Sequence, residues 1–447
     1  MESENKAAPL TADSLSARLL LAYGLPGLPL AVLTLPLYVY LPAFYAEDVG
    51  IGFALVGTIL LVARLWDVVT DPLVGLLSDR WNGRLGRRRP WLLTATPLAI
   101  VSAWFLFHPP TSAGWPYLLA WTMALYLAGT MVKLPYEAWG AEISPDYDGR
   151  SRIAGAREAC VVIGTLLAAG APVVFGGGKA EALTLLAWIF ALTLPVAVLL
   201  ACRYVPDTQA RPTQQLTWGR GLRILSGNRP FRRLLLAYLI NGVANGLPAT
   251  LFLLYVEHVL QAEGWAGPLL FVYFLCGVLS VPVWLRLSAH YGKHRVWSAA
   301  MAATCLVFAC VPLLQAGDQV WFLAICVLTG FGLGADLVLP PSMQADVIDF
   351  DRLRSRRSRA GLYFALWGMA TKLALALAVG IAFPILELAG FREDAQAAPP
   401  AIALFTLAAL YSLAPVAFKL VSIALMWGFP LTRARQARIR RLIEARQ

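Results

Sequence analysis

Charged side chains are scarce in this chain. Only 14% of its 447 residues are Asp, Glu, Lys or Arg, whereas 59% are hydrophobic, and the mean hydropathy is +0.65. A soluble domain of this size needs more charge to remain dispersed. The apolar residues also occur in runs of about 20, long enough to cross roughly 30 Å of hydrocarbon. The composition therefore argues against an ordinary soluble protein and predicts a polytopic membrane protein.

Residues typical of catalysis and metal binding are also few. The four histidines lie at the ends of expected helices, with no nucleophile or metal ligand paired with them. The six cysteines fall inside or at the ends of apolar runs without metal-ligand spacing, which favours buried small hydrophobes. Gly176–Lys179 resembles a phosphate loop but lacks two residues of that motif. We therefore expect no enzyme activity, no metal and no cofactor, apart from a coupling ion, H⁺ or Na⁺.

Twelve apolar segments are expected to be transmembrane helices. They lie at about 20–45, 52–78, 90–109, 115–139, 154–176, 181–203, 232–259, 265–288, 295–315, 319–343, 360–389 and 401–428. Arg and Lys gather in every second connection, Arg150 and Arg152 among them, and in the tail. Because cations accumulate on the cytoplasmic side, both termini are expected in the cytoplasm. The net charge of +11 is then an orientation signal, and no nucleic-acid partner is expected.

The longest polar connection divides the chain into two groups of six helices. The polar N-terminal segment lacks a basic n-region, so we expect no cleaved signal peptide. The basic tail is expected to lie as a helix on the anionic inner leaflet. The expected parts are an N-terminal segment (1–18), a six-helix bundle (19–203), a basic loop with a short amphipathic stretch (204–231), a second bundle (232–428) and a tail (429–447).

A faint internal repeat supports this division. Leu77–Arg80 leads through a basic turn to Trp91, and Leu287–His290 leads through another to Trp297. Both lie between the second and third helix of their half. Paired six-helix halves are the architecture of the major facilitator fold, with the solute bound near the bilayer midplane. We therefore expect an all-α protein of two pseudo-symmetric bundles, and a monomer.

Ionisable side chains inside apolar runs are candidates for function, because each costs several kcal/mol by most estimates. Asp67 and Asp71 lie one turn apart on one face of the second helix. Two such carboxylates can coordinate a monovalent cation or hold a proton, because like charges ionise together only at a cost. In a structural alternative, Asp71, which precedes Pro72, stabilises the end of the helix. On the fourth helix, Lys133 and Glu137 form either an intrahelical ion pair or a site in which Lys133 faces a central cavity.

The second half offers a further set of polar candidates. Asp336 and Lys372 add a carboxylate and a cation on the tenth and eleventh helices. Asn241 and Asn245, one turn apart on the seventh, either contact a solute hydroxyl or join helices. Three glycines of the tenth helix allow close packing or a bend: Gly330, Gly332 and Gly334. Aromatic residues that could stack on a sugar, or else lie in the core or face lipid, are Tyr23, Tyr38, Tyr40, Trp104, Trp139, Tyr363 and Trp367.

Three segments form a set with a family likeness. They are Ala63–Pro72; Leu134-Pro135-Tyr136 with Arg150 and Arg157 downstream; and Ala345–Asp351 followed by Gly361–Ala365 and Lys372. In this order they resemble the glycoside–pentoside–hexuronide:cation symporter family of the major facilitator superfamily, to which melibiose permease belongs. The resemblance implies import of a small glycoside with Na⁺, Li⁺ or H⁺. It places the cation at Asp67 and Asp71 beside the sugar, gives Arg157 a part in binding the solute, and puts Lys372 in a central charge network. Tyr136 is a further candidate contact for the solute.

Two positions depart from that family's pattern. Where melibiose permease has an acidic sugar ligand on the first helix, this chain has Gly24–Pro29, and where it has a second acid on the fourth, this chain has Lys133. One hypothesis makes the Lys133 ammonium a tethered counter-ion for Asp67 and Asp71, which predicts Na⁺-independent transport. Another has Lys133, Arg157 and Lys372 bind an anionic solute such as a uronate, a sulfonated sugar or a phosphate-bearing molecule.

Taken together, these features predict a secondary active transporter in the plasma or bacterial inner membrane. We expect it to carry a small polar solute, such as a glycoside or anionic sugar, by cation-coupled alternating access with H⁺ favoured. One alternative is a lysophospholipid carrier, since the vertebrate lysolipid symporter shares the family and the first helix here is apolar and proline-rich. Another is a non-transporting receptor or scaffold, for which large soluble loops would be expected. The expected partners are the solute and the lipid bilayer.

Overall fold

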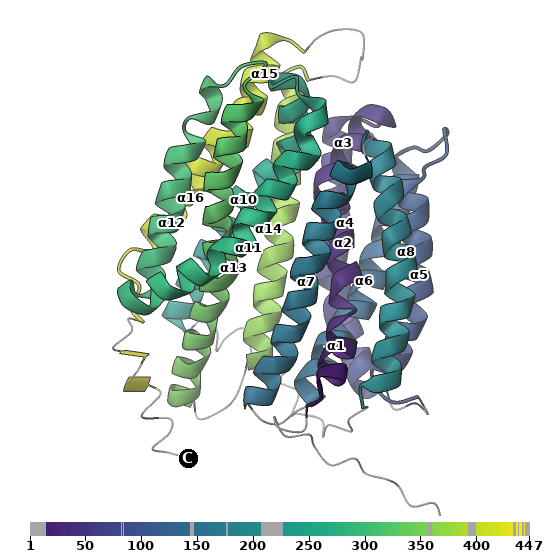
Figure 1. The fold of residues 1–447 in the computed structure, drawn as a ribbon, viewed down its shortest axis with the longest axis vertical. Helices are drawn as coiled ribbons and strands as arrows, with labels where there is room; N and C mark the ends of the chain where they lie inside the picture. Colours follow the sequence, from purple (N-terminus) through teal and green to yellow (C-terminus); the bar gives the residue numbers. More distant parts are fainter. Residues whose placement is uncertain are drawn as a thin grey trace, which may run out of the picture. The chain divides into compact units, whose positions relative to one another are not determined.

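The structure, a computed structural model, describes residues 15–81, 83, 85–143, 147–175, 178–206, 227–355, 360–391 and 399–431, with 435, 436, 438, 439 and 442. Within these ranges the chain is helical, with no β-strand (Figure 1). Twelve spans of the described part are long and apolar enough to cross a membrane, which confirms the predicted number. The amphipathic stretch expected between residues 216 and 225 lies outside the described residues.

The chain divides into two compact units, residues 1–51 with 59–214, and residues 52–58 with 215–447. In the first unit, drawn in purple to teal, the helices run side by side (Figure 1). Its first span consists of α1 (Ala17–Gly24), α2 (Gly27–Leu35), the π-helix η2 (Pro36–Tyr40), α3 (Leu41–Ala43) and the π-helix η3 (Phe44–Asp48). The following spans are α4 (Phe53–Arg80), whose start at 53–58 is assigned to the second unit, α5 (Arg89–Phe107), α6 (Trp115–Ile143), α7 (Tyr147–Phe175) and α8 (Lys179–Tyr204).

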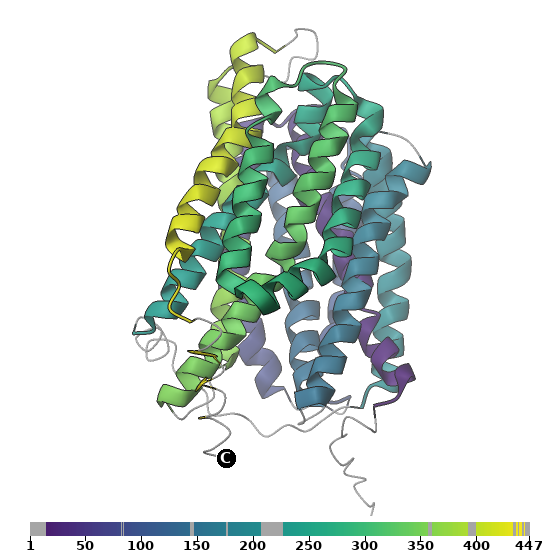
Figure 2. The same cartoon turned by 60° about the vertical axis from the view of Figure 1, so that its left-hand side comes forward.

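The second unit, drawn in green to yellow, also contains six spans (Figure 2). Its first span is α10 (Arg229–Leu254) with the π-helix η4 (Tyr255–Val259). Then follow η5 (Glu263–Trp265), α11 (Ala266–Tyr291), α12 (Lys293–Phe308), η6 (Val311–Leu313), α13 (Gln319–Ser355) and α14 (Ala360–Leu388). The last span joins α15 (Ala401–Ala408), the π-helix η7 (Ala409–Leu413) and α16 (Ala414–Met426).

Three helices differ from the sequence-based expectation. The first span is interrupted, because Pro26 and Pro36 remove backbone N–H groups that a continuous α-helix would use. Helix α13 continues to Ser355, about three turns beyond its expected end. Helix α7 begins at Tyr147, so Arg150 and Arg152 lie inside a helix rather than in a connection.

Small residues bring helices of the second unit close together. Gly242 and Gly246 of α10 face Ala374 and Ala378 of α14, and a Cβ on either glycine would lie 2.7 Å from the alanine methyl. Between membrane-spanning helices, faces made of small residues allow the backbones to approach closely and gain van der Waals contact.

The three glycines of α13 serve the same purpose. A methyl group on Gly330 would overlap a backbone carbonyl of α11, on Gly334 it would overlap Ser280, and on Gly332 it would overlap Thr304 of α12. Of the two roles considered for these glycines, the structure therefore shows close packing.

Each unit repeats one tyrosine contact. In the first span of the first unit, the Tyr45 hydroxyl donates to Leu106 O at the end of α5, at 2.7 Å. In the first span of the second unit, the Tyr255 hydroxyl donates to Val311 O, just after α12, at 3.0 Å. Both tyrosines are fully buried and both contacts join the first span of a unit to its third.

An ion pair repeats in the same way. Arg88, at the start of α5, lies 2.6 Å from Glu142 near the end of α6 and donates to Ser78 Oγ. Lys293, at the start of α12, lies 2.6 Å from Asp346 of α13. Each pair joins the third span of its unit to the fourth, which agrees with the internal repeat predicted from the sequence.

The basic tail packs partly against its own unit. Ile439 is 4% exposed and belongs to a core cluster with Trp297 and Val347. Gln436 Nε2 donates to Asp349 Oδ2 of α13 at 3.0 Å. At these positions the tail lies against protein, where the sequence had predicted a helix on the membrane surface.

Candidate functional site

Two carboxylates of α4 share one hydroxyl of α6. Asp67 is buried and Asp71 half-buried. Thr130 Oγ1 lies 2.8 Å from Asp67 Oδ1 and also 2.8 Å from Asp71 Oδ1. A threonine hydroxyl carries one hydrogen and can donate to only one of these oxygens. For both contacts to be hydrogen bonds, one carboxyl must be protonated and donate to Thr130.

Asp67 is also held by Arg64, three residues earlier on the same helix. Arg64 Nη1 lies 3.3 Å from Asp67 Oδ2, and the two side chains are only 8% and 3% exposed. The guanidinium carbon lies 3.8 Å from the centroid of the Tyr126 ring, and a guanidinium N–H donates to the Tyr38 hydroxyl. Pairing and stacking of this kind are what a desolvated arginine requires.

Lys133 lies on α6, one turn beyond Thr130, and is exposed. The ion pairs found among the described residues do not include Lys133, so neither the pair with Glu137 nor a pair with the two aspartates is present there. The cation paired with Asp67 is Arg64. The Lys133 ammonium is instead accessible from outside the protein core.

Glu137 pairs with the next helix. Arg157 Nη1 of α7 lies 3.5 Å from Glu137 Oε1, and Arg157 also lies 2.6 Å from Glu158. Arg157 is 25% exposed and Glu137 38% exposed, so this pair is not enclosed by the protein. Lys133, Glu137 and Arg157 thus form a charged, accessible group on α6 and α7.

Tyr136 and Trp367 are packed in the interior of their units. The Tyr136 hydroxyl donates to Tyr23 O at 2.6 Å, and the Tyr23 hydroxyl donates to Tyr136 O at 3.2 Å. Trp367 is 8% exposed and stacks on Tyr238 with 3.8 Å between the ring centroids. The next helix turn holds Lys372, which is half-buried on α14. In this structure, Tyr136 and Trp367 join helices rather than face an open site.

In the second unit, Asn241, Asn245 and Asp336 surround a lysine that sequence analysis missed. Lys419 of α16 is 3% exposed. Its Nζ lies 2.9 Å from Asn241 Oδ1, 2.7 Å from Asn245 Oδ1 and 3.4 Å from Asp336 Oδ2. The two asparagines therefore belong to a polar cluster around the buried Lys419 ammonium.

Asp336 receives hydrogen bonds from three neutral side chains as well. Asn241 Nδ2 donates to its Oδ1 at 3.0 Å, and Asn245 Nδ2 donates to its Oδ2 at 2.9 Å. Trp297 Nε1 of α12 donates to Oδ1 at 2.6 Å. The cluster thereby connects four helices of the second unit: α10, α12, α13 and α16.

A signal for two of the missed residues was present in the sequence. Lys419 is the single Lys, Arg, Asp or Glu between residues 401 and 426, and Arg64 is the single basic residue between 53 and 75. A lone ionisable residue in an apolar run is a functional candidate by default. Thr130 and Trp297 carry no such signal, because neutral side chains are common in membrane helices.

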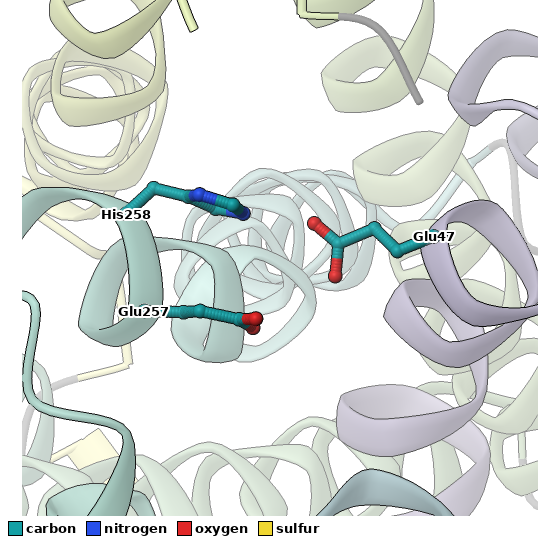
Figure 3. Close-up of side chains that lie close together, drawn as sticks. All are labelled: Glu47, Glu257 and His258. Carbon is teal, nitrogen blue, oxygen red and sulfur yellow. The ribbon is translucent and has the colours of Figure 1, made fainter. Parts of the chain in front are cut away.

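Three further ionisable residues lie on π-helical turns (Figure 3). Glu257 and His258 are consecutive residues of η4 in the second unit, where the His258 ring lies edge-on to Phe391. Glu47 belongs to η3 in the first unit, where it forms an ion pair with Lys179 at the start of α8. Within the first unit, the Glu47 ion pair therefore joins the end of the first span to the start of the last span, α8.

The sequence profile of a family described as MFS/sugar transport protein matches residues 22–433. The chain belongs to this family. Within it, the predicted likeness to glycoside–pentoside–hexuronide:cation symporters is confirmed. The protein is a multi-pass membrane transporter of the major facilitator type and not an enzyme.

Two curated relatives and one solved structure illustrate the similarity. The human sodium-dependent lysophosphatidylcholine symporter 1 is 25% identical over 428 residues, 87% of this chain and 78% of the relative. A glucuronide carrier protein homolog of Escherichia coli (strain K12) is 25% identical over 407 residues, 88% of each chain. The crystal structure of a point mutant of the nucleoside transporter NupG matches with a TM-score of 0.69 at 12% identity, covering 93% of this chain and 99% of that one, which shows the shared fold.

Proposed function

We propose that the protein is a proton-coupled symporter of a small polar solute, such as a glycoside or an anionic sugar, acting by alternating access in a plasma or bacterial inner membrane. The observation that carries the proposal is the Thr130 hydroxyl within hydrogen-bonding distance of both Asp67 and Asp71. One proton added to the carboxylate pair supplies the hydrogen that the second contact needs. After release of that proton, the one hydroxyl hydrogen of Thr130 serves only one of the two contacts.

A proton suits this group better than Na⁺. Arg64 already supplies a fixed positive charge to Asp67. Asp67 Oδ1 and Asp71 Oδ1 are bridged by the Thr130 hydroxyl, and a proton on one carboxyl completes this bridge. Asp71 is the less buried of the two carboxyls, so we assign it the proton that is taken up and released.

The solute class follows from the charged, accessible group on α6 and α7. Lys133 is exposed, and Arg157 is 25% exposed while pairing with Glu137. Guanidinium and ammonium groups bind carboxylates, sulfonates and phosphates. The glucuronide carrier homolog among the relatives is named for a sugar of this charge.

Uptake into proteoliposomes tests the proposal with two probes, methyl β-D-glucuronide and methyl β-D-glucoside. An inward proton gradient without Na⁺ should drive accumulation of labelled methyl β-D-glucuronide inside the vesicles. Unlabelled glucuronide should inhibit this uptake more strongly than unlabelled glucoside. Uptake that requires Na⁺ would contradict proton coupling. Equal competition by the two probes would contradict the role of Lys133 and Arg157.

A lysophospholipid is the second candidate solute. The first span carries no acidic residue at Gly24–Pro29, and its two glycines pack against the backbone of α7. The human relative is named for lysophosphatidylcholine. If lysophosphatidylcholine raises the melting temperature of the detergent-solubilised protein and neither glycoside does, the solute assignment moves to lipid.

A further inference from the structure

We propose that Lys419 is a tethered cation. Its ammonium fills an oxygen-lined pocket in the second unit, and the pocket becomes a monovalent metal-ion site once the ammonium is removed. The inference concerns the second unit alone and does not depend on the coupling proton assigned to Asp67 and Asp71 in the first.

The pocket has the composition of a cation site. Three side-chain oxygens, from Asn241, Asn245 and Asp336, lie 2.7 to 3.4 Å from the Lys419 nitrogen. An ammonium has three hydrogens and no acceptor, so these three oxygens satisfy it completely. Carboxamide and carboxylate oxygens are also the ligands that hard metal cations prefer.

The oxygens are held in place by bonds that do not involve Lys419. Each asparagine turns its carbonyl oxygen toward the ammonium and its amino group toward Asp336. Trp297 Nε1 fixes the carboxylate from a third helix. Such outer hydrogen bonds orient ligands in metal sites, so we expect the pocket to persist when the lysine is shortened.

Charge and the number of available oxygens restrict the ion to a monovalent one. The pocket contains one carboxylate, and a single positive charge neutralises it. A divalent ion would leave an excess charge in a buried place and would need six or more oxygens. The candidates are therefore Na⁺, K⁺ and Li⁺.

This arrangement explains how the second unit can keep a carboxylate that is only 13% exposed without external salt. The positive charge belongs to the lysine side chain, so the pocket remains occupied whatever the ionic composition of the surrounding solution. It also makes Asn241, Asn245 and Asp336 positioning residues of the bundle, and not contacts for the solute.

The test compares the melting temperature of Lys419→Ala with that of the wild type in NaCl, KCl, LiCl and choline chloride at equal ionic strength. The variant should melt higher by on the order of 5 °C in at least one alkali salt than in choline, beyond any response of the wild type. The control, Asp336→Asn/Lys419→Ala, lacks the carboxylate and should lose that difference. Equal melting of Lys419→Ala in all four salts would overturn the proposal.

If Lys419→Ala gives no folded protein in choline, the yield of monodisperse protein replaces the melting temperature. Recovery when Na⁺, K⁺ or Li⁺ is present throughout purification supports the cation pocket. Recovery only after Asp336→Asn is added would show that Lys419 acts merely as a counter-charge, and would contradict the pocket. A change in the wild-type melting temperature with Na⁺ concerns the coupling site at Asp67 and Asp71, whereas the pocket is tested by Lys419→Ala. Proton coupling and the cation pocket can therefore be contradicted independently.

Discussion

At the scale of the residue, the stability of the transporter depends on the small number of its buried charges and on the partners that compensate each of them. Asp67 has Arg64 at 3.3 Å and the Thr130 hydroxyl at 2.8 Å, while Lys419 has three oxygens around its nitrogen. A buried ion of this kind is stable only with a partner and additional hydrogen bonds. Removing a single partner should therefore have a larger effect than removing both.

Thr130→Val keeps the size of the side chain but removes the hydroxyl between Asp67 and Asp71. Proton-driven uptake should fall by about tenfold or more, which corresponds to roughly 1.4 kcal/mol, the scale of one hydrogen bond. The measurement is initial uptake under an imposed proton gradient. Thr130→Ser, which retains the hydroxyl, should transport at close to the wild-type rate. Uptake by the valine variant at the wild-type rate would remove Thr130 from the coupling site.

Arg64→Gln removes the cation paired with Asp67 and the stacking on Tyr126. We expect the free energy of unfolding to fall by about 3 kcal/mol, because a buried carboxylate loses its charge partner. Arg64→Gln/Asp67→Asn should regain most of that loss. Unfolding titrations in mixed micelles provide the comparison, and strictly additive effects of the two substitutions would show that the pair is not coupled.

At the scale of the element, the helix bounds agree with those expected from the sequence where hydropathy alone determines them. They differ where proline or packing has an effect. Helix α14 spans Ala360–Leu388, within one residue of the expected 360–389. The first span instead contains two π-helical segments: η2 begins at Pro36, and η3 begins two residues after Pro42. Its interruptions come from missing backbone donors, which an average over hydropathy does not detect.

Close helix packing gives a prediction at this scale. In Gly334→Ala the new methyl group would overlap Ser280 of α11, so we expect a loss of about 1–3 kcal/mol in the free energy of unfolding. The matched control is Gly368→Ala on α14, where nothing lies within 4 Å of the added Cβ. There the better helix propensity of alanine should leave the stability unchanged or raise it by up to about 1 kcal/mol. Equal effects at the two sites would contradict the packing role of Gly334.

At the scale of the whole molecule, the two units repeat their contacts at the ends of the spans but differ in the middle. The tyrosine contact and the ion pair occur once in each unit, between matching spans. The middle of the first unit holds the aspartate pair with Thr130, whereas the second holds a lysine among asparagines. The repeat thus maintains the fold, and the differences between the units provide the separate chemistry of each.

The repeated tyrosines allow a test of this view. Tyr45→Phe and Tyr255→Phe each remove one buried hydrogen bond, and each should lower the free energy of unfolding by about 1–2 kcal/mol. The two residues share no bonding partner, so the double variant should lose the sum to within about 0.5 kcal/mol. A cost at one tyrosine only would show that the two contacts are not equivalent.

The sequence by itself determined the class of the protein, the number of spans and the family. Those properties depend on apolar run length and on short motifs such as Ala63–Pro72, which are local features of the chain. It also determined that Asp67 and Asp71 share a face, because helical periodicity is local.

Only the tertiary structure decided which charges meet. Thr130 is 63 residues from Asp67, and Lys419 is 178 residues from Asn241. It was Arg64, and not Lys133, that paired with Asp67, and the asparagines turned toward a lysine of the last span. Such choices depend on which helix faces come together when the spans pack, and a buried ion takes the partner that this packing places within hydrogen-bonding distance.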